Sequence, residues 1–499
     1  MIGYARQAAG AAGYGLPLET SALVLDSGES RVVLCGVDVL GMNGPACDAL
    51  VERVASATGT QPAAVLLNWS HTHLAPQLGE LGIPFGYLAE AVRASASAYS
   101  HVLQDTIVSV CRLAVERMEP AAIVWGQCAT DLAVNRRERT LGSLDGDTIL
   151  GWNPEELVDN QVTVLQARRA DESPIATLVA YGCHPVTASW NVLRYSGDYP
   201  AIMRQQIRTT VGGECIFFQG AGGNILPRFA FTDDEIEAQR VGTRLAVAAL
   251  AAVAERRAFP VQISSYRERS ATPYRIYREY PLAPAPIRLA YAQKRVTIPL
   301  LPHPELADVE RERKEYETSL AAAQDLGEGE WTKVAYYWAA WARTTAAQLR
   351  AGTAPTDVSA PIHAVRIGEG AIVTAPGEAF TEYGMAVKER SAAVPTLYAG
   401  YTNGLLGYLP TAAEYQFGGY EAGYAHKGVG LPSLFDPSVE RICVETGVRL
   451  LEQLFPDAQP WDADDGWKAS GALPVLPEPP TLRHPDQQTT ESSPILSDV

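Results

Sequence analysis

The chain has 499 residues, of which 47% are hydrophobic and 19% are charged, and its formal net charge is −17. This composition is typical of a soluble globular protein with a sizeable core, and the length allows one large domain with insertions or two or three ordinary ones. The negative charge argues against nucleic acid and anionic membrane surfaces as partners.

The sequence also indicates a cellular compartment. No segment has the apolar length that is needed to span a bilayer, and residues 1–6 lack the pattern of a secretory signal. The seven cysteines are scattered without CxxC spacing, which favours reduced thiols over a disulfide framework. We therefore expect a cytoplasmic protein without stable membrane insertion.

The first half of the chain reads as strands alternating with helices. Residues 21–26 and 31–38 predict two strands around a turn, and residues 44–58 predict a helix. The apolar run at 63–67 predicts a buried strand that leads into Ser70-His71-Thr72-His73. Because side chains two apart on a strand point to the same face, His71 and His73 are expected to face one cavity. Further along, we expect one or two helices at 88–119 and a helix from about residue 201. Strands are expected at 121–134, 162–168, 175–182 and 214–218.

The second half continues this alternation. An Ala-rich helix is expected at 233–256, mixed strand and loop at 262–300, two helices at about 304–325 and 330–351, and a β-hairpin at 359–375. Residues 397–401 predict the last clear strand. We expect an α/β fold, with a mixed β-sheet core flanked by helices. Residues 1–460 form the predicted catalytic domain, and the Pro- and Ser-rich residues 461–499 are expected to be a disordered tail.

Four potential metal ligands follow separate predicted strands. His71 follows the strand at 63–67, His184 follows the strand at 175–182, Glu378 follows the hairpin, and Tyr408 follows the last strand. Neutral imidazole nitrogens and a carboxylate are ligands that a catalytic Zn²⁺ takes. If the strands share a sheet, these side chains lie at one edge, at the C-terminal ends of the strands.

Five motifs occur in the order seen in neutral, non-lysosomal ceramidases: Ser70-His71-Thr72-His73, Cys183-His184-Pro185, Gln219-Gly-Ala-Gly-Gly-Asn224, Pro376-Gly377-Glu378 and Gly407-Tyr408-Leu409-Pro410-Thr411. The sequence therefore resembles this family over about residues 3–448. The resemblance implies one Zn²⁺ per chain, held by His71, His184, Glu378 and Tyr408. It also places Arg136, from an Asn-Arg element, near the substrate carbonyl.

The resemblance has departures that bear on the substrate. Ceramidases carry an Ig-like C-terminal domain, whereas here the matched region is followed by a short stretch. Where ceramidases have an Asn-x-Tyr-x-x-Tyr element, this sequence has residues 403–408 and keeps only the second tyrosine, Tyr408. The zinc chemistry is therefore better supported than ceramide as the substrate, and we expect a soluble N-acyl compound to be preferred.

The predicted reaction is hydrolysis of the amide bond of a small N-acyl substrate. A metal-activated water attacks the carbonyl, and the metal with nearby donors stabilises the oxyanion. His73 is the candidate for donating to the oxyanion or moving a proton, and Tyr415 and Tyr420 are candidates to complete the site. Asp38 and Asp198 are candidates to orient the ligand histidines. A zinc esterase or lactonase, or a non-catalytic binding protein of the same fold, remains as an alternative.

Overall fold

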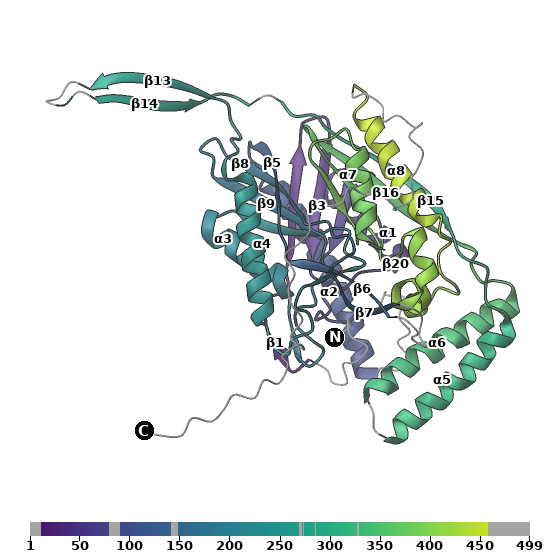
Figure 1. The fold of residues 1–499 in the computed structure, drawn as a ribbon. Coiled ribbons are helices and arrows are strands. Elements are labelled where there is room, and N and C mark those ends of the chain that lie inside the picture. Colours follow the sequence, from purple (N-terminus) through teal and green to yellow (C-terminus); the bar gives the residue numbers. More distant parts are fainter. Residues whose placement is uncertain are drawn as a thin grey trace, which may run out of the picture. The chain divides into compact units, whose positions relative to one another are not determined.

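A computed structural model of the chain describes residues 11–78, 90–140, 148–268, 272, 274–284, 286–326 and 329–457. The chain divides into a compact unit, Met1–Asp462, and a second unit, Ala463–Val499. The predicted disordered tail lies outside the described residues. Within the first unit the predicted α/β fold is confirmed, with strands inside and helices outside (Figure 1).

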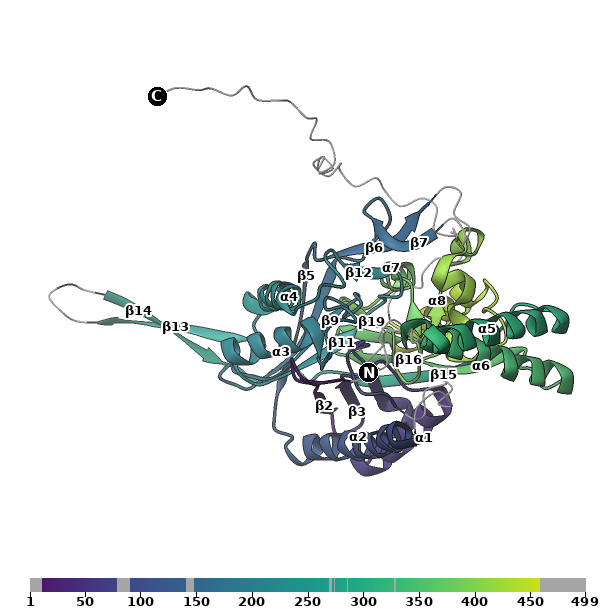
Figure 2. The same ribbon diagram turned by 90° about the horizontal axis from the view of Figure 1, so that it is seen from below.

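Three sheets form the centre of the unit (Figures 1 and 2). The first has the order β2-β3-β4 and consists of Thr20–Asp26, Arg31–Val37 and Val65–Trp69. The second has the order β11-β9-β8-β5 and consists of Glu214–Gln219, Pro174–Tyr181, Gln161–Arg168 and Ala122–Ala129. The third has the order β15-β16-β17-β19 and consists of Leu289–Pro299, Asp357–Ile367, Gly370–Thr374 and Thr396–Ala399.

One apolar core lies between the three sheets. Leu34 of β3, Leu178 of β9 and Leu397 of β19 belong to the same buried cluster. Residues next to these on the strands, such as Cys35 and Val179, belong to separate clusters beneath the helices. Because side chains alternate along a strand, a sheet that is covered on both faces needs nearly continuous apolar strands. This is the pattern that the sequence shows.

Pairs of helices cover the outer faces of the sheets (Figures 1 and 2). The first sheet is covered by α1 (Gly44–Thr58) and α2 (Glu90–Glu116), the second by α3 (Asp198–Val211) and α4 (Ile236–Ala254), and the third by α7 (Thr381–Arg390) and α8 (Val439–Leu454). Helix α1 begins where the Asn43 side chain accepts a hydrogen bond from the backbone N–H of Ala46, and it ends at Gly59 with φ 66°. These are the usual N-cap and C-cap signals.

Further elements connect the sheets. The two helices that the sequence predicts at about 304–325 and 330–351 are α5 (Leu306–Leu326) and α6 (Gly329–Ala351), and they pack against each other. The single strand expected at 121–134 is instead two, β5 and β6 (Ala133–Arg139), so Arg136 lies inside a strand rather than after one. The other short strands are β1 (Gly13–Tyr14), β7 (Thr148–Asn153), β10 (Arg194–Tyr195), β12 (Ile225–Pro227), β13 (Val261–Glu268), β14 (Tyr274–Pro281), β18 (Glu378–Ala379) and β20 (Tyr408–Leu409).

Two buried amides join the three sheets at one edge. The Asn68 side chain accepts from the backbone N–H of Gln219 at 2.6 Å and donates to the carbonyls of Gly400 at 2.8 Å and Gln219 at 3.2 Å. Gln219 in turn donates through its side chain to the carbonyl of Cys183 at 2.7 Å. Backbone groups at or just beyond the ends of β9, β11 and β19 are thereby satisfied where the strands stop.

Candidate metal centre

His71 lies two residues beyond the end of β4 and has a left-handed backbone conformation, with φ 65°. The strand alternation that the sequence suggested therefore does not position the His71–His73 pair. A turn does this instead, and it brings the two ring centroids to 5.0 Å. A residue other than glycine with positive φ is strained, and such strain is concentrated at functional sites. The Nδ1 atom of His71 lies 2.6 Å from the carbonyl oxygen of Leu40.

His184 follows β9 and is fully buried. Its Nδ1 lies 2.7 Å from the carbonyl oxygen of Gly222. Its neighbour Cys183 is held by the Gln219 side chain and by the hydroxyl of Tyr199, which donates to the Cys183 carbonyl at 2.5 Å. Burial lowers the pKa of His184 to about 4, so the imidazole is neutral at pH 7.

Glu378 and Tyr408 are direct neighbours, because β18 and β20 pair in parallel with Glu378 opposite Tyr408. Glu378 Oε2 lies 3.3 Å from Nε2 of His71 and 3.2 Å from Nε2 of His184. The Tyr408 ring stacks on His184 with the centroids 6.4 Å apart. The structure thus brings together all four residues that the sequence nominated as metal ligands.

The atoms of this cluster fit a bound cation. A carbonyl only accepts hydrogen bonds, so Nδ1 of both His71 and His184 carries the proton. In the neutral tautomer each Nε2 then presents a lone pair towards the same carboxylate oxygen of Glu378. Converging lone pairs and a buried carboxylate repel each other unless a cation lies between them.

His73 lies against the same cluster. Its ring centroid is 5.8 Å from that of His184, and one ligand atom from each of His71, His73 and His184 lies within 4.8 Å of the others. Burial and the neighbouring His71 lower the pKa of His73 well below its usual value. His73 can therefore contribute a neutral imidazole, either to a metal or to a proton transfer.

Arg136 reaches the centre from β6. Its guanidinium carbon lies 5.3 Å from the centroid of the Tyr408 ring. The same guanidinium donates through Nε to Glu421 at 2.6 Å, and Arg137 donates to the other oxygen of Glu421 at 2.7 Å. Glu421 therefore fixes a buried cation beside Tyr408.

The two remaining predicted tyrosines lie at different places. Tyr420 packs edge-on against Tyr408, with ring centroids 5.4 Å apart, so it borders the centre. Tyr415 lines a small cavity behind Tyr408. Burial raises the pKa of Tyr415, and the charges that add to this effect are Asp436 and Glu440 rather than those of the centre.

The prediction that Asp38 and Asp198 orient the ligand histidines is wrong, because both carboxylates bind other groups. Asp38 forms an ion pair with Arg204 and accepts the backbone N–H of Glu19 at 2.9 Å. Asp198 accepts from the Thr187 hydroxyl at 2.7 Å. The backbone carbonyls of Leu40 and Gly222 orient the histidines instead. Every residue has a backbone carbonyl, so the sequence does not identify which carbonyls accept hydrogen bonds from the two histidines.

The turn Gly220–Asn224 packs directly against the backbone that carries the ligands. A Cβ on Gly223 would lie 2.2 Å from the carbonyl oxygen of Glu378, and a Cβ on Gly222 would lie 3.0 Å from the backbone nitrogen of Cys183. Glycine is needed here because no side chain fits between these backbones. Asn224 ends the turn, and its carbonyl accepts from the Arg136 backbone N–H at 2.9 Å.

A row of aromatic rings extends from the centre to the helical hairpin α5–α6. Tyr408 contacts Tyr420, Tyr420 contacts Tyr424 at 5.5 Å, and Tyr424 contacts Trp338 of α6 at 6.3 Å between centroids. Trp338 in turn contacts Tyr316 of α5 at 5.4 Å. These rings give one side of the centre an apolar wall.

The fold and the cluster together define an α/β protein with a candidate metal centre. It consists of histidines that follow β4 and β9, together with Glu378 and Tyr408, which are the first residues of the paired strands β18 and β20. Among solved structures, the chain is similar to the neutral ceramidase from Pseudomonas aeruginosa, at a TM-score of 0.57 and 17% sequence identity, over 95% of this chain and 74% of that one. It is also similar to a ceramidase complexed with C2, at a TM-score of 0.58 and 17% identity, over 93% and 73% of the two chains.

The predicted resemblance to neutral ceramidases is therefore confirmed for the fold. No protein-family model matches the sequence, and no curated protein matches it. Within the part of the chain that the structure describes, no helix is long and apolar enough to cross a membrane.

The Gly223 contact can be tested by Gly223→Ala. The added methyl group collides with the Glu378 carbonyl, so we expect Glu378 to move and the affinity for zinc to fall at least ~10-fold, about 1.4 kcal/mol. Isothermal titration of the metal-free protein measures this. The control is Gly44→Ala, where a Cβ meets nothing within 4 Å. Equal zinc affinity in both variants would contradict the packing account.

Proposed function

We propose that the chain is a zinc-dependent hydrolase that cleaves the amide bond of an N-acyl compound. The observation that carries this proposal is the convergence of two Nε2 lone pairs and the Glu378 carboxylate on one buried point, on a fold like that of ceramidases. His71, His184 and Glu378 would hold the ion, and Tyr408, whose ring stacks on His184, is the fourth candidate ligand. A zinc ion in such a ligand set supplies a nucleophilic water at neutral pH and polarises a carbonyl oxygen.

The residues around the cluster match the needs of acyl transfer. A carbonyl under attack becomes an oxyanion, which needs preorganised donors or cations. Arg136 is held by Glu421 on the Tyr408 side of the cluster. Burial raises the pKa of Tyr408 well above its usual value, so in the absence of a cation the phenol keeps its proton and can donate it in a hydrogen bond. His73 is the group to move a proton to the leaving amine, because its imidazole is neutral and lies beside the cluster.

The aromatic row favours a substrate with an apolar part. Tyr420 contacts Tyr408, and Tyr424 and Trp338 continue the row of rings away from the centre, whereas the chain as a whole is acidic. We infer that a small N-acyl compound places its acyl chain or its amine substituent along this wall. A negative surface disfavours approach to an anionic bilayer, so a soluble amide fits better than ceramide embedded in a membrane.

A substrate panel tests the function. Purified protein is assayed with soluble N-acyl amines, matched esters, and long-chain ceramide in vesicles, before chelation, after chelation and after zinc is restored. We expect soluble amides to have the highest kcat/KM, activity to be lost on chelation, and zinc to restore it. Activity on the esters alone would assign an esterase. Full activity after the removal of all metal would refute the proposal.

The Tyr408 oxygen is tested by Tyr408→Phe. If this oxygen serves the reaction, kcat should fall by at least ~10²-fold, as for the loss of one oxyanion donor. Tyr408 could act as a metal ligand or as a hydrogen-bond donor to the oxyanion. Zinc content, measured on the same sample, separates these two roles, since loss of a ligand releases metal and loss of a donor does not. The control is Tyr398→Phe, which removes a buried hydroxyl elsewhere in the fold. Unchanged kcat in Tyr408→Phe would remove this residue from the site.

A further inference from the structure

The hairpin strands β13 (Val261–Glu268) and β14 (Tyr274–Pro281), which we call the arm, extend away from the three sheets in both views (Figures 1 and 2). Its strands pair over eight positions, from Val261 opposite Pro281 to Glu268 opposite Tyr274. Large apolar side chains on it are exposed to solvent: Ile263 by 63%, Tyr274 by 57%, Tyr277 by 66% and Tyr280 by 50%. A two-stranded hairpin is marginally stable by itself in water, so these side chains indicate that the arm is covered by a partner.

The apolar side chains point to both faces of the arm. Residues that are paired across the strands share a face, which places Ile263 and Tyr277 on one side and Tyr274 and Tyr280 on the other. A flat surface such as a bilayer can cover only one of these sides. A groove in a protein can cover both.

The charge of the arm favours a copy of this same chain as the partner. Residues 261–281 contain four arginines and two glutamates, whereas the whole chain has a net charge of −17. A basic arm is attracted to an acidic protein surface.

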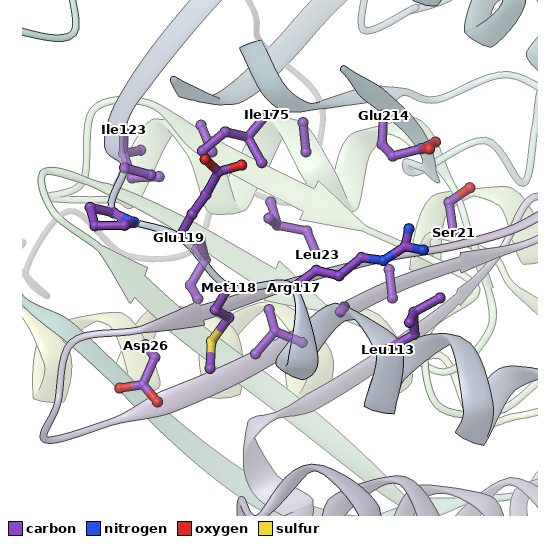
Figure 3. A pocket seen from close by; sticks show the side chains of 18 of the residues that line it. Ser21, Leu23, Asp26, Leu113, Arg117, Met118, Glu119, Ile123, Ile175 and Glu214 are labelled. Atoms are coloured by element: carbon purple, nitrogen blue, oxygen red, sulfur yellow. The ribbon is translucent and has the colours of Figure 1, made fainter. Parts of the chain in front are cut away.

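A groove that suits the arm lies at the starts of β9 and β11, the opposite ends of these strands from the metal centre. Its volume is about 800 Å³, and β2, the end of α2 and the starts of β5 and β9 line it. Figure 3 shows Leu23, Ile123 and Ile175 among its lining side chains. Three apolar side chains of the lining are exposed, Leu113 by 40%, Met118 by 39% and Ile287 by 37%.

The backbone of β2 adds a second means of recognition. β2 is the edge strand of its sheet and pairs with β3 on one side. Among the described residues, no strand pairs with its other side. Such an edge accepts an added strand through main-chain hydrogen bonds. β2 has seven residues and each strand of the arm has eight, so the lengths match.

The groove and the root of the arm are adjacent in the same chain, because Ile287 and Leu289, which follow the arm, line the groove. A two-fold axis near this root would therefore place each arm beside the groove of the other copy. We propose that the protein forms a symmetric dimer by arm exchange, in which β13–β14 of each copy lies along β2 in the groove of its partner. This dimer does not depend on the proposed hydrolase function.

Cross-linking of the full chain tests the contact directly. Tyr277 is replaced by the photoreactive residue p-benzoylphenylalanine, and the control places the same residue at Val247, which is 63% exposed on α4. After irradiation we expect a covalent dimer from position 277, with the link in residues 20–27 or 110–123, and none from position 247. A link within one chain, a link to a different surface, or no dimer at position 277 would overturn the proposal.

Sedimentation velocity on substituted chains gives an independent test. Ile263→Ser with Tyr277→Ser on the arm, and Met118→Glu in the groove, should each weaken dimerisation at least ~10-fold in Kd, whereas Val247→Ser should leave it unchanged. A wild-type chain that stays monomeric at all concentrations would overturn the proposal. The same holds if the monomer binds anionic vesicles through the arm.

Discussion

The side chain of Asn68 connects all three sheets at the edge from which the candidate ligands emerge. It belongs to the first sheet, bonds the Gln219 backbone of the second in both directions, and donates to Gly400 just beyond the third. Each of these buried groups would cost about 1–3 kcal/mol if it were left without a partner. The geometry of the metal centre depends on this amide. His71 follows Asn68 by three residues, and Gln219, which Asn68 holds, bonds the carbonyl of Cys183, next to His184.

The strand ends meet closely because glycines line the contact. Gly223 lies against the Glu378 carbonyl, and Gly400 would place a Cβ 2.7 Å from the Gly220 carbonyl oxygen. With the backbones this close, residues from four separate segments reach one point. The result is a ligand cluster whose imidazoles are oriented by backbone carbonyls and whose nearest cation, Arg136, is fixed by Glu421.

Much of the fold could be predicted from local patterns. Continuous apolar runs such as 31–37 and 175–181 predicted strands that are buried on both faces, and a helix was predicted at 44–58, where α1 lies. The four nominated ligands could be found because each is a chemically distinctive residue just after an apolar run. The distribution of the strands among three sheets, and their order within each sheet, could not be predicted. Both are set by long-range packing that single segments do not encode.

The remainder of the site depends on contacts between distant segments. Glu421 binds Arg136 across 285 positions of sequence, in a π-helical turn that no periodicity indicates. The Tyr401 ring packs against His71 with the centroids 4.6 Å apart. The sequence did not indicate this contact, because a tyrosine after a strand is a common core residue. The left-handed conformation of His71 is likewise imposed by its surroundings.

The central claim is that His71, His184 and Glu378 bind one zinc ion while His73 serves the reaction. The most direct measurement is the zinc content and kcat of the wild-type protein, His184→Ala and His73→Ala, each purified in the same way. The account predicts about one zinc per wild-type chain, loss of most zinc in His184→Ala, and retained zinc in His73→Ala with kcat lowered on the order of 10²–10⁴-fold. An active wild-type protein without zinc, or equal loss of metal from both variants, would contradict it.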